Sequence, residues 1–486
     1  MKILLTLIAL SSLSLASTRP NIIIIYTDDL GYGDLSCYGA TAIRTPHIDQ
    51  LAKDGIRFTD GYAAAATCTP SRYSLLTGKL PFRQNGTGIA RGDAKLIINP
   101  EHQTLPSMLK QAGYATACIG KWHLGLGDGK APINWNTKIK PGPNEIGFDY
   151  SYIIPATNDR TPCVYLENGR VANLDPSDPL FVSYGKKVGT EPTVKEFPDR
   201  VKVKCRPGDH HNGTIHGGVG RIGTMTGGMA ARWDDETMAD DLAAKAIQYI
   251  RKHKDQPFFL YFSTADIHAP RLFHPRFSGK SGLGPRGDMT LQLDDCVGQL
   301  TRELTQLKLH QNTLIIFSSD NGPKLEDAYL DGSLAAAQKK NFNPAGPLRG
   351  TKYTPYEGGT RVPFIVTWKG TIAAGNSDAV ISQVDLLASL AKLTGQSIEP
   401  PHQTDSQNHL PALLDHRAAA REFLICGRRT MTIRKGNWKL INSKQPQLYN
   451  LKQDLGETKN LASQLPEKVK ILQQKLQEEV KRYQLQ

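Results

Sequence analysis

The sequence predicts an α/β fold with a mostly parallel sheet, followed by a small C-terminal α+β subdomain. Short apolar runs alternate with amphipathic helical segments, as in strands that are joined by crossover helices. The runs are rich in β-branched and aromatic residues, which is typical of strands buried on both faces. Near the C-terminus a turn signal between two short apolar runs indicates an antiparallel hairpin.

Four buried strands are expected, with a shorter fifth strand at 362–366 and the hairpin at 431–441. Between residues 134 and 232 Pro and Gly are frequent, so we expect an irregular segment that carries substrate contacts. The four buried strands cover residues 21–27, 114–119, 257–263 and 313–319.

Helices are expected where apolar residues recur at helical spacing or where cap residues mark an end. Pro46 suits the first turn of a helix that runs to Lys53. A final helix over 466–483 carries an apolar stripe and completes the C-terminal subdomain. The other expected helices cover residues 71–77, 104–112, 237–252, 289–307 and 385–393.

The chain has 486 residues, enough for one large domain and a smaller one. The polar, loop-rich stretch 400–421 marks a plausible boundary between them. We therefore expect a large domain over 17–410 and the α+β subdomain over 411–486.

The first 16 residues have the features of a secretory signal peptide. Lys2 precedes the apolar run 3–10, and small residues lead to a cleavage position after Ala16. The run is too short for a transmembrane helix, and no later stretch is long enough to span a bilayer. We expect signal peptide 1–16 to be removed and the protein to be exported, either to the periplasm or as a secreted protein.

The net charge of +13 favours an acidic partner, such as a sulfated or phosphorylated polymer. Dense Lys/Arg runs interleaved with aromatic residues are absent, which disfavours nucleic acid. The seven cysteines are scattered without a C-x-x-C pair, so no zinc site is expected. Export permits disulfides, and buried free thiols are the alternative.

Polar residues follow each of the four buried strands at its carboxyl end. Ligands bind at this edge of an open α/β sheet, and structural side chains have no reason to gather there. An Asp pair after the first strand and an Asp-Asn pair after the fourth offer only oxygen ligands, which favours Ca²⁺ or Mg²⁺ over zinc or copper. The oxygen donors are Asp28, Asp29, Asp320 and Asn321, and the other residues at this edge are Lys121, His123 and His268.

Residues 68–72 read Cys-Thr-Pro-Ser-Arg and begin a helix that Gly78 can end. The N–H groups and the dipole at a helix N-terminus favour anions, and Arg72 adds a positive charge. On these grounds Cys68 is either a nucleophile or a buried structural thiol.

The segment 68–72 matches the C-x-P-S-R signature of the type I sulfatases, and the match continues to Gly78. The chain therefore resembles the formylglycine-dependent sulfatases of the alkaline-phosphatase-like superfamily, in particular microbial polysaccharide and N-acetylgalactosamine-type sulfatases. The resemblance implies a large mixed, mostly parallel sheet sandwiched by helices. Further segments that look like those of sulfatases are residues 21–34, 120–125, 320–322, 348–363 and 448–461.

The resemblance also implies that a formylglycine-generating or sulfatase-maturating enzyme converts Cys68 to formylglycine. The hydrated aldehyde would be a further ligand of the divalent metal, usually calcium, and would attack the sulfur of the ester. Asp320 would accept the proton of the attacking hydroxyl. Many arylsulfatases carry a Ser near residues 153–159, where Thr157 is the nearest hydroxyl in this chain.

The remaining roles follow from the same resemblance. Positive charge from Arg72, Lys121 and Lys352 would balance the sulfate oxygens. His268, helped by Lys352, would protonate the leaving alcohol, and His123 would take the proton of the second hydroxyl.

The expected activity is removal of sulfate from a sulfated carbohydrate, such as a glycosaminoglycan, a mucin-type glycan or an algal galactan, by a monomer or homodimer. Two alternatives remain: a phosphatase or phosphodiesterase of the same superfamily, and a non-catalytic binder of sulfated glycans in which Cys68 is unmodified. Metal binding by the loop histidines is not expected. Candidate sugar contacts are Arg271 and the histidines 210, 211 and 216.

Overall fold

The computed structural model describes residues 19–399 and 404–482. The predicted signal peptide, residues 1–16, lies outside the described residues, as does the end of the predicted C-terminal helix at Tyr483. Within the described part of the chain all seven cysteines are free, and no helix is both long and apolar enough to cross a membrane.

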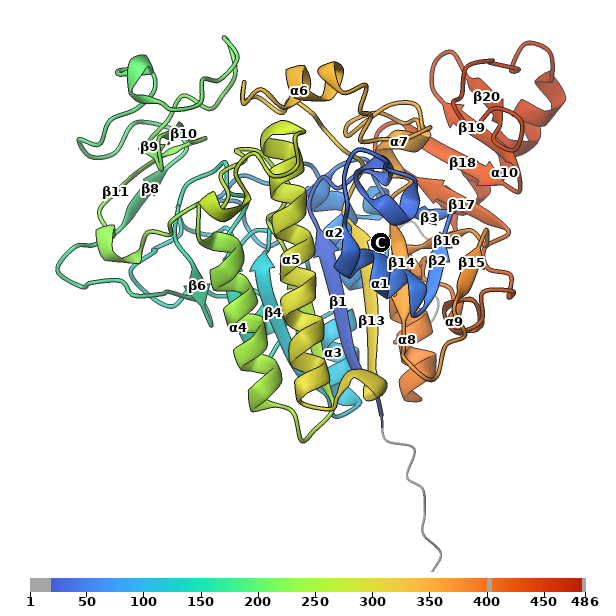
Figure 1. Cartoon of the computed structure of the whole chain (residues 1–486), viewed down its shortest axis with the longest axis horizontal. Helices are drawn as coiled ribbons and strands as arrows, with labels where there is room; N and C mark the ends of the chain where they lie inside the picture. Colours follow the sequence, from blue (N-terminus) through green and yellow to red (C-terminus); the bar gives the residue numbers. More distant parts are fainter. Residues whose placement is uncertain (1–18, 400–403, 483–486) are drawn as a thin grey trace, which may run out of the picture.

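A ten-stranded sheet forms the centre of the molecule, in the order β15-β2-β14-β13-β1-β12-β4-β5-β6-β7 (Figure 1). The four predicted buried strands are confirmed and lie side by side at its middle, all parallel. Strand β5 continues this parallel set. The five parallel strands are β1 (Asn21–Thr27), β4 (Ala115–Lys121), β5 (Tyr150–Ile154), β12 (Phe258–Ser263) and β13 (Thr313–Ser319).

The outer strands make the sheet mixed, as expected. The predicted fifth strand, β14, runs antiparallel to both of its neighbours, β13 and β2. At the other edge β6 runs antiparallel to β5, and β7 runs antiparallel to β6. These three strands lie between residues 134 and 232, where the sequence predicted an irregular segment. The outer strands are β2 (Ile56–Phe58), β14 (Phe364–Thr367), β15 (Gly375–Ser377), β6 (Leu166–Glu167) and β7 (Arg170–Val171).

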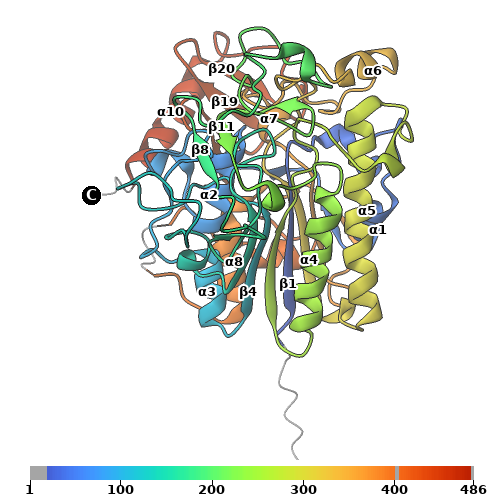
Figure 2. The same cartoon turned by 90° about the vertical axis from the view of Figure 1, so that its left-hand side faces the viewer.

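Helices cover both faces of the sheet (Figure 2). One face carries α1 (Pro46–Lys53), α4 (Met238–Lys252) and α5 (Gly284–Gln306). The other carries α2 (Cys68–Thr77), α3 (Leu105–Gln111) and α8 (Leu386–Thr394). The predicted start of α5 at Met289 was wrong by five residues, because a polar first turn with Pro285 hides the apolar spacing.

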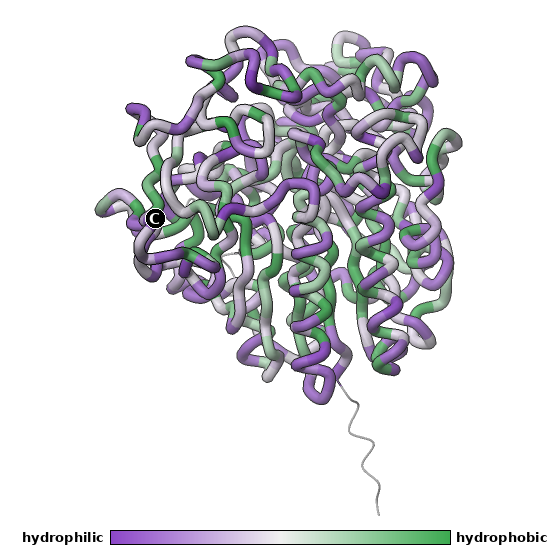
Figure 3. The backbone as a smooth tube through the Cα atoms, turned by 60° about the vertical axis from the view of Figure 1, so that its left-hand side comes forward, coloured by the Kyte–Doolittle hydropathy of each residue, from purple (hydrophilic) through white to green (hydrophobic). Residues whose placement is uncertain are grey.

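Burial from both sides explains the sequence of the central strands. Ile22 to Ile25 of β1 are each at most 1% exposed, since helices pack on both faces of the strand. In Figure 3 the hydrophobic residues gather in the sheet and in the helices beside it, whereas the loops above the carboxyl ends of the strands are mainly hydrophilic. The polar residues that follow the strands therefore sit between an apolar core and a polar rim.

The C-terminal part forms a separate four-stranded antiparallel sheet on which α10 (Pro466–Lys481) packs. The predicted hairpin is its central pair, β18 (Met431–Lys435) and β19 (Trp438–Asn442), flanked by β17 (Phe423–Cys426) and β20 (Gln447–Asn450). The predicted division at 410/411 falls at the first residue of the short helix α9 (Leu410–Leu414).

A buried ion pair network joins this sheet to the part of the chain that forms the ten-stranded sheet. Lys439 of β19 lies 2.9 Å from both Glu357 and Glu457, and all three side chains are at most 2% exposed. Burial opposes ionisation of Glu357, but Lys439 and Arg361 outweigh it and hold its pKa at about 2. Glu357 opens the short helix α7 (Glu357–Thr360), which follows the Lys352 segment, so the C-terminal sheet supports residues near the site.

Replacing Lys439 by Met is expected to lower the free energy of unfolding by about 3–5 kcal/mol, because it leaves Glu457 and Glu357 without their shared cation. Urea denaturation of the purified variant measures this loss. Lys435→Ala is the matched control, since Lys435 pairs with Glu422 at the surface of the same sheet and should cost less than about 1 kcal/mol. Equal losses in the two variants would contradict the role given to the buried network.

Candidate active site

The carboxyl edge of the sheet brings the predicted site residues together. Two Asp follow β1, one Lys ends β4, and Asp320 and Asn321 follow β13 directly. Because these strands are parallel neighbours, their ends meet at one place. The residues collected there are all at most 4% exposed: Asp28, Asp29, Lys121, His123, His268, Asp320, Asn321 and Lys352.

Helix α2 places Cys68 at this edge as its first residue. Thr67 before it has extended backbone, and Gly78 ends the helix at φ 65° in the left-handed region, where glycine has no steric penalty. Every residue of α2 is buried. One turn after Cys68, the guanidinium of Arg72 donates to Asp320 through Nε at 3.0 Å and Nη2 at 2.7 Å.

Buried carboxylates and lysines pair across the site. The ammonium of Lys121 donates to Asp28 and lies 3.9 Å from Asp320. The ammonium of Lys352 donates to Asp29 at 2.9 Å and to Asp327 at 2.6 Å. Cations and anions therefore alternate at close range, and all of these side chains except Asp327 are at most 1% exposed.

Two oxygens at the centre of this network have no hydrogen-bond partner among the described residues: Oδ1 of Asp28 and Oδ1 of Asn321. The amide nitrogen of Asn321 donates to Asp29 at 2.7 Å, which leaves the oxygen free. Buried, unpartnered oxygens on neighbouring carboxylate and amide groups are the donor set of a hard cation. The residues present therefore fit calcium or magnesium.

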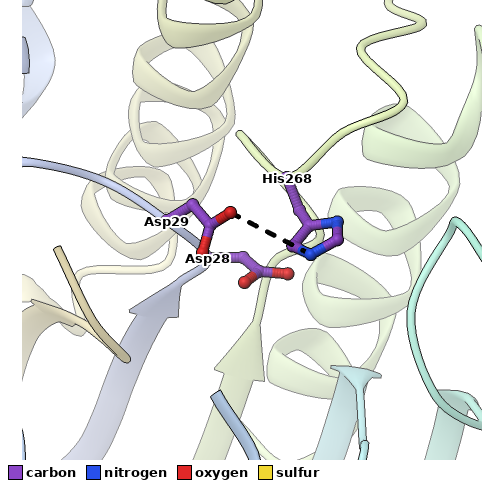
Figure 4. A group of neighbouring side chains, drawn as sticks. All are labelled: Asp28, Asp29 and His268. Atoms are coloured by element: carbon purple, nitrogen blue, oxygen red, sulfur yellow. Dashed lines mark ion pairs between the residues drawn. The ribbon is translucent and has the colours of Figure 1, made fainter. Parts of the chain in front are cut away.

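Figure 4 shows Asp28, Asp29 and His268 turned toward one another. One ligand atom from each lies within 4.8 Å of the others, and Nε2 of His268 is 3.9 Å from a carboxylate oxygen of Asp29. The sequence predicted a site with oxygen ligands only, whereas the structure also places Nε2 of His268 next to the carboxylates.

The two site histidines have opposite hydrogen-bonding patterns. His123 has Nε2 at 2.9 Å from the carbonyl of Ala90, while its buried Nδ1 has no hydrogen-bond partner in the described part of the chain. His268 instead has Nδ1 against the carbonyl of Ala269. Since a carbonyl accepts only, the bonded nitrogen carries the hydrogen in each ring. His123 thus offers the lone pair of Nδ1, and His268 offers that of Nε2.

Burial lowers the pKa of both histidines well below the ordinary value. The neighbouring Lys121 adds to the effect at His123, and Lys352 and Lys121 add to it at His268. Both rings are therefore neutral before substrate binds. An anion bound beside the lysines would offset their charge and favour protonation of His268.

The Cys68 thiol is a poor nucleophile in this environment. Burial raises its pKa, and nearby Asp320 and Asp28 add to the rise, although Lys121 and Lys352 oppose it. The thiolate is the reactive form of cysteine, so an unmodified Cys68 would remain neutral. The electrostatic effects also show that the groups predicted to act with Cys68 lie around its side chain.

The candidate sugar contacts differ in their exposure and in the groups they bind. Arg271 has no exposed side-chain surface and donates to Asp331 at 2.7 Å and to the carbonyls of Lys324 and Leu325. His216 bonds the carbonyl of Trp233, and His211 lies 3.0 Å from Asp159. Of the three histidines in this loop, only His210 is exposed, and it belongs to the wall of the second pocket described below.

Sequence reasoning missed four charged or polar residues at the site. Asp159 and Arg160 form an ion pair beyond β5, and the charge of Arg160 acts on both Cys68 and His123. Asp327 and Tyr353 lie against Lys352. A strand prediction at 150–154 would have pointed to the first pair, whereas the second comes from loops without a periodic signal.

Two pockets open beside the site and share Ile89 in their walls. The first, of about 520 Å³, includes Thr67 and Tyr353, the chain neighbours of Cys68 and Lys352. The second, of about 790 Å³, includes Arg160 and Ala90. Each pocket is large enough to hold at least one sugar ring.

The mixed sheet, with a helix N-terminus and ion-binding groups at its carboxyl edge, is that of the alkaline-phosphatase-like hydrolases. The family profile named Sulfatase matches residues 20–396. The chain is 49% identical over 480 residues to the N-acetylgalactosamine-6-O-sulfatase of Bacteroides thetaiotaomicron, covering 95% of this chain and 93% of that protein. The chain therefore belongs to the sulfatase family and is a sulfuric ester hydrolase.

Two further similarities cover most of the chain. Human arylsulfatase A is 32% identical over 504 residues, covering 96% of this chain and 89% of its own. A solved structure from work on the metabolism of multiple glycosaminoglycans by Bacteroides thetaiotaomicron has a TM-score of 0.91 at 48% identity, covering 95% of this chain and 99% of that one. The similarity thus includes the C-terminal sheet as well as the catalytic part.

Proposed function

We propose that this sulfatase removes sulfate from a sulfated glycan, with the 6-O-sulfate of N-acetylgalactosamine as the substrate group. The observation that carries the reaction type is the position of Cys68 at the first turn of α2, among two lysines and two carboxylates that act on its side chain. The substrate group is supported by the 49% identity to an N-acetylgalactosamine-6-O-sulfatase. The net charge of +13 suits a polyanionic glycan.

Cys68 is proposed to become formylglycine, made by a formylglycine-generating or sulfatase-maturating enzyme. The raised pKa of the buried thiol supports this, because an unmodified side chain would be unreactive. When present, the hydrated aldehyde supplies two hydroxyls on one carbon, one to attack sulfur and one whose deprotonation releases sulfate.

The surrounding side chains bind the sulfate and move protons. Lys121 and Lys352 hold positive charge where the sulfate oxygens develop negative charge. Arg72 fixes Asp320, which accepts the proton of the attacking hydroxyl. Nε2 of His268 carries the proton to the leaving sugar oxygen, and the free Nδ1 of His123 accepts the proton of the second hydroxyl.

Calcium, or alternatively magnesium, is proposed to bind at the oxygen cluster of Asp28, Asp29, Asp320 and Asn321, together with the group at position 68. The free oxygens of Asp28 and Asn321 support this assignment. When bound, the ion supplies Lewis-acid polarisation and neutralises part of the sulfate charge.

Calcium at a hundredfold excess over its dissociation constant is expected to raise the free energy of unfolding by about 2.7 kcal/mol, because the ion binds the folded cluster and not the unfolded chain. Urea denaturation with calcium, with magnesium and with a chelator measures the effect. Asn321→Ala should weaken the stabilisation, whereas the Lys435→Ala protein should retain it. Identical unfolding curves in calcium and chelator would exclude this site.

Residues 1–16 are proposed to direct export, to the periplasm or outside the cell. The sulfated glycan would then meet the enzyme outside the cytoplasm. Two expectations remain predictions from the sequence. One is the division of the chain into 17–410 and 411–486, and the other is that the enzyme is a monomer or homodimer.

The experiment that tests the function is a screen of position-specific sulfated sugars with detection of released sulfate. We expect turnover of 6-O-sulfated N-acetylgalactosamine, and little or none of the 4-O-sulfated isomer. Peptide mass spectrometry across residues 57–72 is expected to show the mass of formylglycine in place of cysteine at position 68. Cleavage of phosphate esters alone would favour the phosphatase alternative, and an intact thiol with glycan binding but no turnover would favour the non-catalytic binder.

A further inference from the structure

The first pocket lies between the catalytic part and the C-terminal sheet. Its floor contains Ala66 and Thr67, directly before Cys68, and Tyr353, directly after Lys352. The backbone N–H of Tyr353 donates to the carbonyl of Ala66 at 2.8 Å, which joins the two segments. The opposite wall is the turn between β17 and β18, residues 427–430. A group in this pocket would therefore adjoin whatever is bound at Cys68.

The lining is cationic and rich in hydroxyl groups. It contains Arg428 and Arg429, six threonines and Tyr353, and neither Asp nor Glu. The ring of Tyr353 is 48% exposed, a surface on which a sugar ring can pack. The lining thus combines apolar contact surface with positive charge, as the binding of an anionic sugar requires.

The two arginines lack acidic partners. No carboxylate of the described residues lies within ion-pair distance of either guanidinium, whereas Arg421 and Arg434, which are near them in the chain, are paired with Asp385 and Asp60. Arg428 is half-buried and donates from Nε to the hydroxyl of Thr87 at 3.1 Å, which holds its guanidinium beside another residue of the pocket lining. Arg429 is exposed. Two unpaired guanidinium groups are suited to bidentate binding of a carboxylate or a sulfate.

From this geometry we infer that the pocket is a subsite for an anionic sugar adjacent to the sulfated sugar, and that Arg428 and Arg429 bind its carboxylate or sulfate. The inference rests on the proposed function for the identity of the reacting sugar. It assigns to the C-terminal sheet a direct part in substrate selection. The enzyme would then prefer an acidic disaccharide unit to the isolated sulfated monosaccharide.

The test compares kcat/KM for three substrates that carry the same sulfated N-acetylgalactosamine: the monosaccharide, a disaccharide with a neighbouring uronate, and that disaccharide with its carboxylate reduced to an alcohol. A disaccharide whose neighbour carries sulfate instead of a carboxylate separates the two anion sources. For the wild type we expect the ratio of acidic disaccharide to monosaccharide to exceed one. The Arg428→Ala/Arg429→Ala variant is expected to lower that ratio by about 10- to 100-fold, the usual effect of losing charge-assisted hydrogen bonds.

The matched control is Lys435→Ala, which removes a surface cation of the same sheet outside the pocket and should keep the wild-type ratio. An unchanged ratio in the double variant, or equal turnover of the acidic and reduced disaccharides by the wild type, would overturn the subsite. If no substrate is hydrolysed, the proposed function has failed. Calorimetry of the acidic disaccharide binding to the wild type and to the double variant then tests the pocket separately. Equal affinities of the two proteins for the disaccharide would reject the subsite.

Discussion

Replacing Cys68 by Ala is expected to abolish turnover, lowering kcat by about 10⁴- to 10⁶-fold, the range found when a covalent nucleophile is removed. Cys68→Ser should fail equally unless the maturation enzyme accepts serine, since a serine hydroxyl provides no second hydroxyl on the same carbon. Sulfate release from 6-O-sulfated N-acetylgalactosamine measures the loss. The physical reason is that charged groups around position 68 are arranged for an anionic ester, but the thiol itself is buried and neutral.

The control for this variant is Cys37→Ser. Cys37 is half-buried, its backbone N–H donates to Asp49 of α1, and it is not one of the residues collected at the site, so its substitution should leave kcat within about twofold of the wild type. Circular dichroism should show that both variants fold. Appreciable turnover by a folded Cys68→Ala protein would remove position 68 from the reaction.

Replacing His268 by Ala is expected to lower kcat by about 10²- to 10⁴-fold for sulfated sugars, because the sugar oxygen must leave as a protonated alcohol. For an aryl sulfate with an acidic phenol, which leaves without protonation, the loss should shrink to less than about tenfold. The structure supports this role through the free Nε2 of His268, 3.9 Å from carboxylates of both Asp29 and Asp327.

Kinetics on a series of leaving groups separates this role from a purely structural one. A variant that had lost only its local packing would lose the same factor with every leaving group. His102→Ala is the control, since His102 is exposed and lies outside the site. A loss in the His268 variant that does not depend on the leaving group would contradict its assignment as the acid.

The central strands and the residues at their ends could be predicted from the sequence for a physical reason. A strand buried on both faces must be apolar throughout, so β1 and β13 stand out, and neighbouring carboxylates that gather at the carboxyl edge of such strands indicate a ligand site. Asp28, Asp29, Asp320 and Asn321 were found in this way. Periodicity also identified α4, whose apolar residues face the sheet.

Other parts gave no such signal. Lys352 lies in an irregular segment, and only the resemblance to sulfatases indicated it. Strand β5 was hidden because it is only five residues long and lies in a region rich in Pro and Gly, and Asp159 and Arg160 were missed with it. The pairing of Arg271 with Asp331 depends on two loops that meet only in the folded chain, so the sequence suggested a free cation where the structure has a buried ion pair.

The complete burial of α2 has a consequence for the order of events during biosynthesis. Cys68 is only 2% exposed, and the residues after it are packed from Thr69 to Thr77 without a gap in burial. An enzyme that oxidises this cysteine could not reach it in the folded protein, so it would have to act before the chain folds. If the chain folds before the cysteine is oxidised, the Cys68 thiol is buried, and a modifying enzyme added afterwards cannot reach it.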